Sequence, residues 1–206
     1  MSEDDGTTDA ARHALIASMV PRGARVLDVG CSDGALLDRL RTERAAKAYG
    51  LEIDAGAVAR AVARGLSVVQ GDADTDLASY PDGAFGVVVL SNSLQALRSP
   101  LPVLRRAVGV GARVVVAFPN FGHWRVRASL VRTGRMPRSR ALPALWYDTE
   151  NIHLCTVLDF LDLCRAEGWS VHEAHGVAGA RSWRFDPDRP AAANLRAQEA
   201  VFCVAG

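Results

Sequence analysis

The stretch that most constrains the fold of this chain runs from Arg25 to Gly34 and reads RVLDVGCSDG. An apolar segment ends in an acidic residue, a glycine turn follows, and a helix-forming segment comes next. This layout is typical of the first strand and the cofactor-binding turn of an open parallel α/β sheet. Gly30 can adopt the positive φ that a sharp turn requires, and Gly34 lets the following helix pack closely. The pattern predicts a nucleotide-type cofactor at this strand end.

The next two predicted strands also end in acidic residues. Glu52 closes the segment 46–53 and lies 18 residues after Gly34, near the offset of roughly 20 residues at which an acid reaches a cofactor ribose. Asp72 follows the predicted strand 66–70. Each acid alone is equally compatible with a solvated charge or a helix cap. Together with Asp28, at the end of the first strand, they favour a binding crevice along one edge of the sheet.

The residue between the two glycines narrows the choice of cofactor. A nicotinamide-binding loop places a second glycine where the backbone meets the pyrophosphate, and this chain has Ser32 there. S-adenosylmethionine carries no phosphate and needs no anion site. The acid before the turn, the glycine spacing, Glu52 and the Gly71-Asp72 pair resemble class I S-adenosylmethionine-dependent methyltransferases. The resemblance implies S-adenosylmethionine or S-adenosylhomocysteine as cofactor, with an affinity that Ser32 is expected to weaken.

Strand and helix patterns alternate along the chain, which predicts an open sheet covered on both faces. We therefore expect an α/β, Rossmann-like class I methyltransferase fold with a seven-stranded mixed sheet. Residues 10–206 are expected to form a single methyltransferase-like domain behind a disordered tail at 1–9. The later strands are predicted at 85–91, 113–118, 169–174 and 200–204, and the later helices at 101–108 and 154–167.

Composition excludes several classes of protein. With 206 residues, 49% hydrophobic and 23% charged, the chain fits one ordinary globular domain. Its net charge of +1 argues against a nucleic-acid footprint over the whole domain, and no apolar run is long enough to span a bilayer. The polar, acidic start does not resemble a secretory signal, and the four cysteines are scattered without metal-binding spacing. We expect a cytoplasmic protein without a metal, a membrane contact or a nucleic-acid partner.

The segment 119–151 shows no clear periodicity and exceeds the usual length of a connection. It begins where the predicted strand 113–118 ends, at the same edge as the glycine turn. Aromatic residues occur near both of its ends, and six arginines occur without an intervening acid: Arg125, Arg127, Arg132, Arg135, Arg138 and Arg140. The segment is predicted to be a lid or a partner-binding insertion that meets an anionic or acidic surface. The alternative is a solvated insertion whose aromatic residues cover the end of the sheet.

Longer motifs carry a more specific resemblance. NFGHWR at 120–125, GRMP at 134–137 and WYDTENIHLCT at 146–156 resemble the family of methionine biosynthesis protein MetW, as do YGLEID at 49–54, QGDAD at 70–74 and LSNSLQA at 90–96. The similarity covers roughly residues 24–205. It implies a place in methionine biosynthesis and partnership with homoserine O-acyltransferase, an enzyme of the α/β-hydrolase fold. The chain departs from the family at Ser32, where glycine is usual, and conservatively at Asn92-Ser93.

The strand-end pattern and the resemblance together predict which residues contact the cofactor. They are Asp28, Gly30, Cys31, Ser32, Gly34, Glu52, Ile53, Asp72, Ala73 and Ser91. If the chain is catalytic, the candidate bases are His123 and His153, although a histidine among aromatic residues is more often structural. No Ser-His-Asp elbow is present, so we do not expect acyl transfer by this chain itself.

Two functions remain open from the sequence. The first is a partner or regulator of homoserine O-acyltransferase that binds S-adenosylmethionine or a related nucleoside. The second is a small-molecule methyltransferase that uses S-adenosylmethionine. Turnover of a methyl acceptor would favour the second function, and co-purification with a more active acyltransferase would favour the first.

Overall fold

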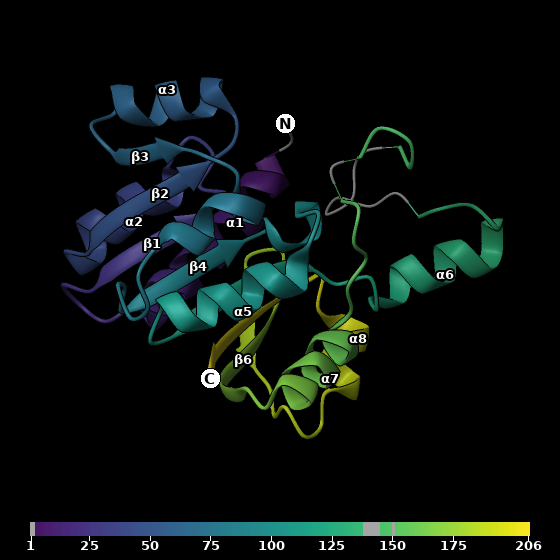
Figure 1. The fold of residues 1–206 in the computed structure, drawn as a ribbon. Helices are drawn as coiled ribbons and strands as arrows, with labels where there is room; N and C mark the ends of the chain where they lie inside the picture. Colours follow the sequence, from purple (N-terminus) through teal and green to yellow (C-terminus); the bar gives the residue numbers. More distant parts are fainter. Residues whose placement is uncertain (1–2, 138–144, 150) are drawn as a thin grey trace.

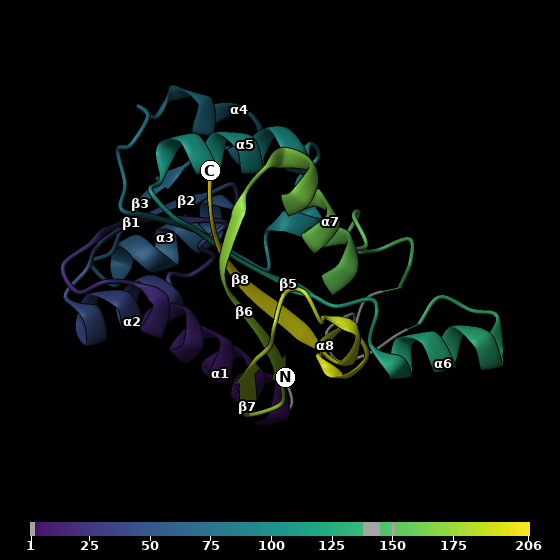
Figure 2. The same ribbon diagram turned by 90° about the horizontal axis from the view of Figure 1, so that it is seen from below.

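The computed structural model describes residues 3–137, 145–149 and 151–206, and in it one sheet lies between two layers of helices (Figures 1 and 2). The strands are β1 (Arg25–Val29), β2 (Lys47–Glu52), β3 (Ser67–Gln70), β4 (Val87–Ser91), β5 (Val114–Pro119), β6 (Ser170–Ala178), β7 (Arg181–Arg184) and β8 (Glu199–Ala205). The helices are α1 (Glu3–Met19), α2 (Ala35–Arg44), α3 (Ala55–Ala63), α4 (Ala73–Asp76), α5 (Pro100–Val110), α6 (Trp124–Thr133), α7 (Val157–Glu167) and α8 (Ala191–Arg196), with short 3-10 turns at Leu77–Ser79 and Leu94–Ala96.

The strand order is β3-β2-β1-β4-β5-β8-β6-β7. The first five strands in this order run parallel, whereas β8 is antiparallel to both β5 and β6. The α/β class and the mixed sheet with helices on both faces are confirmed. The predicted count of seven strands was wrong, because β7 adds an eighth strand as an antiparallel edge partner of β6.

Helices cover both faces of the sheet and bury the side chains of its central strands. In β4, Val88 and Leu90 belong to an apolar cluster that contains residues of α5 and α7. Val87 and Val89 point the opposite way, into a cluster with residues of α1 and α2. Burial on both sides explains why the central strands read as continuous apolar runs. The resulting frame holds the carboxyl ends of β1 to β4 side by side at one edge.

Helix boundaries follow local caps more closely than they follow apolar periodicity. Helix α7 begins at Val157 instead of the predicted residue 154, because the Thr156 side chain and Asp159 form a reciprocal capping box. Helix α1 begins at Glu3, within the segment where the sequence predicted a disordered tail ending at residue 9. The acidic, polar start of the chain hid this helix, although acidic residues are favourable in a first helical turn.

The structure also contains elements that the sequence did not predict. Helix α6 lies inside the segment 119–151, where no periodicity was visible. Val126 is its one buried residue, so the helix packs little against the rest of the domain; its ends are set by His123 and by Gly134, which has a left-handed φ of 62°. Both views show α6 projecting away from the sheet and its covering helices (Figures 1 and 2). The domain assignment and the lid or partner role of 119–151 remain predictions.

Candidate functional site

A cavity of about 860 Å³ opens at the carboxyl ends of β1, β2, β3 and β4. Among the residues predicted to contact a cofactor, those lining it are Gly30, Ser32, Glu52, Ile53, Asp72, Ala73 and Ser91. The side chains of Val29, Leu51 and Leu97 add apolar wall. A crevice of this size, with apolar walls and a few polar groups, is typical of a small-molecule site at the switch point of an α/β sheet.

Glu52, the last residue of β2, holds the glycine turn in place. Its carboxylate accepts one hydrogen bond from the backbone N–H of Ser32, at 2.8 Å, and one from the backbone N–H of Asp54, at 2.9 Å. An ionised carboxylate has about four acceptor positions, so both oxygens keep capacity for further donors. Glu52 can therefore position the loop and accept hydrogen bonds from a ligand at the same time.

Asp72 and Asp74 follow β3, the strand that pairs with β2. Asp72 caps α4 by accepting from the backbone N–H of Asp74, and it also forms an ion pair with Arg98. Asp74 accepts from the backbone N–H groups of Arg98 and Ser99, at 3.0 and 2.7 Å. These contacts fasten the segment after β4 to the segment after β3. Arg98 is largely exposed and covers this side of the cavity.

Two residues at the cavity adopt left-handed backbone conformations that side chains disfavour. Ser32 has a φ of 49° and Asn92 a φ of 57°. Such conformations cost a non-glycine residue of the order of 1 kcal/mol and often mark functional sites. Gly30, at a φ of 76°, has no such cost, and a Cβ there would lie 2.6 Å from the Cβ of Ser93. The turn therefore accepts a side chain at Ser32 under strain and accepts none at Gly30.

Asp28 lies behind the lining instead of on it, which corrects the expectation that three acids line one crevice. Its side chain is buried, and among the described residues its Oδ1 has no hydrogen-bond partner. Burial and the nearby charge of Glu52 raise the pKa of Asp28 to about 7, although Arg12 opposes this shift. A buried carboxylate oxygen without a hydrogen-bond partner is unusual in a folded protein.

Cys31 and Gly34 shape the turn without lining the cavity. The Cys31 thiol packs against Gly50, where a Cβ would lie 2.4 Å from the sulfur, and burial raises the pKa of this thiol. A Cβ at Gly34 would lie 2.4 Å from a methyl group of Leu66, which explains the close approach of α2. Both residues are supports of the loop in the described geometry.

A buried ion pair that was not predicted from the sequence lies beneath the cavity. Arg12 of α1 donates to both carboxylate oxygens of Glu199, each at 2.9 Å, and its Nε donates to the hydroxyl of Ser91 at 3.2 Å. Asn92 donates to the same carboxylate at 3.3 Å. Arg12 precedes Ile16 and Val20 at helical spacing, so an arginine on the buried face of α1 was the available signal.

The cavity lining carries an excess of negative charge. Four carboxylates line it, from Glu52, Asp54, Asp72 and Asp74, against the two guanidinium groups of Arg60 and Arg98. Phosphate groups would be repelled by this balance, whereas a cationic ligand would be attracted. The site therefore suits a nucleoside that carries positive charge better than it suits a dinucleotide.

The two candidate bases lie outside this lining. His123 is buried at the start of α6, where its Nδ1 accepts from the backbone N–H of Arg125 at 3.3 Å, and burial lowers its pKa. His153 has an exposed side chain, and its backbone N–H donates to the carbonyl of Gln95. Their described contacts are those of a helix cap and of a loop anchor.

The described residues were also compared with the requirements of a metal site and of a membrane-spanning helix. Within residues 3–137, 145–149 and 151–206, no group of three or more His, Cys, Asp or Glu side chains is arranged to hold a metal ion. None of the described helices is both long and apolar enough to cross a membrane.

Comparison with known proteins identifies the chain's relatives. The family model described as methionine biosynthesis protein MetW matches residues 10–204. The bifunctional methionine biosynthesis protein MetXA/MetW of Rhodopirellula baltica is 29% identical over 196 residues, which are 91% of this chain and 31% of that protein. The ribosomal protein L11 methyltransferase of Methylobacillus flagellatus is 36% identical over 103 residues, which are 50% of this chain and 35% of that protein. The chain spans about a third of the length of these two relatives.

Solved structures support the fold. An S-adenosylmethionine-dependent methyltransferase from Mesorhizobium loti has a TM-score of 0.68 and 19% identity, covering 96% of this chain and 99% of that chain. A second S-adenosylmethionine-dependent methyltransferase, from Archaeoglobus fulgidus, has a TM-score of 0.67 and 16% identity. The match covers 100% of this chain and 95% of that chain. At these identities the likeness establishes the class I methyltransferase fold, and the predicted fold class is confirmed.

Proposed function

The chain belongs to the methionine biosynthesis protein MetW family, and from this premise we propose that it binds S-adenosylmethionine or S-adenosylhomocysteine and acts with a homoserine O-acyltransferase. The first half of the proposal is supported by the cavity at the strand ends. The second half is supported by the relative from Rhodopirellula baltica, in which MetXA and MetW are parts of one bifunctional protein.

The charge balance of the cavity is the observation that carries the nucleoside proposal. Four carboxylates against two guanidinium groups disfavour phosphates and favour the sulfonium and ammonium charges of S-adenosylmethionine. Glu52 would hold the ribose hydroxyls with its remaining acceptor positions, and Asp72 would accept from the adenine amino group. Asp28 would act as a hydrogen-bond acceptor from beneath the turn, and its partnerless Oδ1 fits this role.

Binding is better supported than methyl transfer. S-adenosylmethionine supplies an electrophilic methyl group, so an enzyme must still align an acceptor and remove any proton that the acceptor carries. The titratable groups that line the described cavity are carboxylates and guanidinium groups, and His123 is engaged as a helix cap. We therefore propose a nucleoside-binding partner of the acyltransferase in preference to a small-molecule methyltransferase.

Isothermal titration with S-adenosylmethionine, S-adenosylhomocysteine and NAD⁺ tests the nucleoside proposal. We expect the first two ligands to bind and NAD⁺ to show no heat of binding, because its pyrophosphate would meet the carboxylates. Binding of NAD⁺ alone, or of none of the three at millimolar concentration, would contradict the proposed cofactor. Methyl transfer to a small acceptor during incubation with S-adenosylmethionine would favour the alternative function.

A further inference from the structure

The arm, defined here as α6 with the described residues 134–137 and 145–149, exposes apolar side chains that a folded protein normally covers. Val131 is 85% exposed, Trp146 is 73% exposed and Tyr147 is 68% exposed. The other large apolar side chains exposed on the arm are Trp124, Leu130, Met136 and Leu145. A concentration of exposed apolar side chains on one projecting segment is typical of an interaction site.

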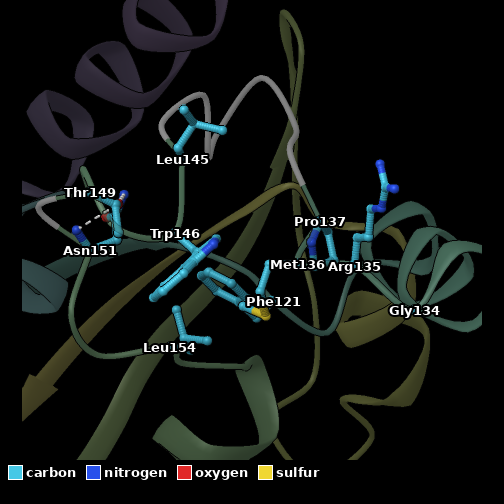
Figure 3. Close-up of a pocket in the computed structure, with 10 residues that line it drawn as sticks. All are labelled: Phe121, Gly134, Arg135, Met136, Pro137, Leu145, Trp146, Thr149, Asn151 and Leu154. Atoms are coloured by element: carbon cyan, nitrogen blue, oxygen red, sulfur yellow. Dashed lines mark hydrogen bonds between the residues drawn. The ribbon is translucent and has the colours of Figure 1, made fainter.

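Three of these exposed residues, Met136, Leu145 and Trp146, line a concave pocket. This second cavity, which we call the arm pocket, measures about 640 Å³. In Figure 3, Trp146 lies over Phe121, with Met136 and Leu154 beside them, while the Arg135 side chain points away from this group. Such a hollow can receive one bulky apolar side chain from another molecule, as the central pockets of protein interfaces do.

The chain just before the arm is anchored to the domain by the buried side chain of Asn120. The side-chain amide of Asn120 donates to the carbonyls of Asn194 and Ala197, both at 2.8 Å. Its oxygen accepts from the backbone N–H groups of Gly122 and Val157. Anchoring the chain at Asn120 lowers the conformational entropy that the arm would lose on binding, which favours docking.

The charge of the arm indicates the nature of the occupant. Arg125, Arg127, Arg132 and Arg135 are exposed, and the sequence contains no acidic residue from Pro119 to Tyr147. Arg138 and Arg140, which the sequence grouped with them, lie outside the described residues. A second copy meeting this face symmetrically would place arginine against arginine. A flat lipid surface would not fill a concave pocket, whereas an acidic protein surface with an apolar tip would match both features.

We propose that the arm pocket docks an acidic surface of the partner protein, one that inserts an apolar or aromatic side chain between Trp146 and Met136. The inference rests on the proposed function, in which that partner is the homoserine O-acyltransferase. The arm pocket also adjoins the cavity at the strand ends, for which we propose a nucleoside ligand. Asn151 and Leu154 line the pocket, and Ile152, between them, lines the cavity. The segment 151–154 is therefore a wall that the two sites share.

Binding measurements with purified acyltransferase test this docking site. We expect Trp146→Ala, and separately the double change Arg132→Glu with Arg135→Glu, to weaken the complex at least about tenfold. Val69→Ala on β3 and Arg181→Glu on β7 are matched controls, because both residues are exposed away from the arm, and they should leave the affinity unchanged. Trp146→Phe should retain most of the affinity, and melting curves should show that every variant is folded.

The possible outcomes separate the docking site from the proposed function. If the acyltransferase binds the wild type and both arm variants equally, the docking site is wrong and the partnership stands. If it does not bind the wild type at all, the partnership fails and the docking site fails with it. Loss of self-association, or of sedimentation with phosphatidylserine vesicles, in Trp146→Ala while acyltransferase binding persists would also overturn the proposal. Reduced hydrogen exchange across 134–149 in the complex would support it.

Discussion

The cavity at the strand ends and the arm are built in opposite ways. The cavity is lined by residues at the ends of β1 to β4, so the ladder of the sheet fixes their positions, and its lining is rich in carboxylates. The arm is held at its base, buries one residue of α6 and carries exposed arginine and tryptophan side chains. The cavity is therefore fixed by the sheet of this chain, whereas the arm presents apolar surface that the proposed partner would cover.

The largest expected effect concerns the Arg12–Glu199 ion pair beneath the cavity and tests how much this pair stabilises the fold. Arg12→Met would leave Glu199 buried without its main partner, so we expect the free energy of unfolding to fall by about 3–5 kcal/mol. Arg132→Met, on the arm, is the matched control and should change stability by less than about 0.5 kcal/mol. Urea denaturation measures both. Equal losses in the two variants would erase the contrast between the regions.

The next effect concerns pH and Asp28. The pKa of Asp28 is raised to about 7 by burial and by the charge of Glu52, while Arg12 lowers it. The folded protein therefore holds this proton more tightly than the unfolded chain, and the free energy of unfolding falls as pH rises from about 4 to about 7. Asp28→Asn should match the wild type near pH 4 and exceed its stability at pH 8 by an amount on the order of 2–4 kcal/mol.

Denaturation curves of Asp28→Asn and wild type at several pH values check this expectation. Comparing the two proteins cancels the titration of other groups, including His13, whose pKa is lowered to about 4 mainly by burial. A difference that does not change with pH would mean that Asp28 is ionised throughout. The expected stability gain would show that the native carboxylate is retained at a cost, as functional groups often are.

Glu52 should affect ligand binding and leave the arm unchanged. Glu52→Gln keeps the shape but loses charge-assisted hydrogen bonds, so we expect nucleoside binding to weaken by about 1.5–3 kcal/mol. Titration calorimetry measures the loss, and the affinity of the same variant for the acyltransferase serves as the internal control. A loss within titration error would assign Glu52 to the loop contacts with Ser32 and Asp54 alone.

The smallest effect is a gain at Ser32. Because Ser32 has a φ of 49°, Ser32→Gly should relieve backbone strain and stabilise the protein by about 1 kcal/mol. Nucleoside affinity should also rise by about 1 kcal/mol if the side chain faces the ligand. Thermal melts and titration calorimetry separate the two gains. Unchanged affinity with raised stability would show that the hydroxymethyl group points away from the ligand.

The sequence predicted the cavity better than the arm for a physical reason. Parallel strands end at one edge, so locating Glu52 and Asp72 at strand ends was enough to place them together. The Arg12–Glu199 pair joins residues at opposite ends of the chain, and no local pattern encodes such a contact. Arg98 reaches the cavity through a short 3-10 turn, which periodicity does not reveal. Helix α6 was not predicted because Arg125, Arg127 and Arg132 stand among its apolar residues and obscure the helical period.

The most direct test of the central claim is an assay of homoserine acylation with increasing amounts of this protein. We expect the wild type to change the rate in a saturable manner. The Arg132→Glu, Arg135→Glu variant should need at least about ten times more protein for the same effect, because rim charges assist docking. An acylation rate that stays constant at every concentration of the wild type, with an active acyltransferase, would contradict the proposed partnership.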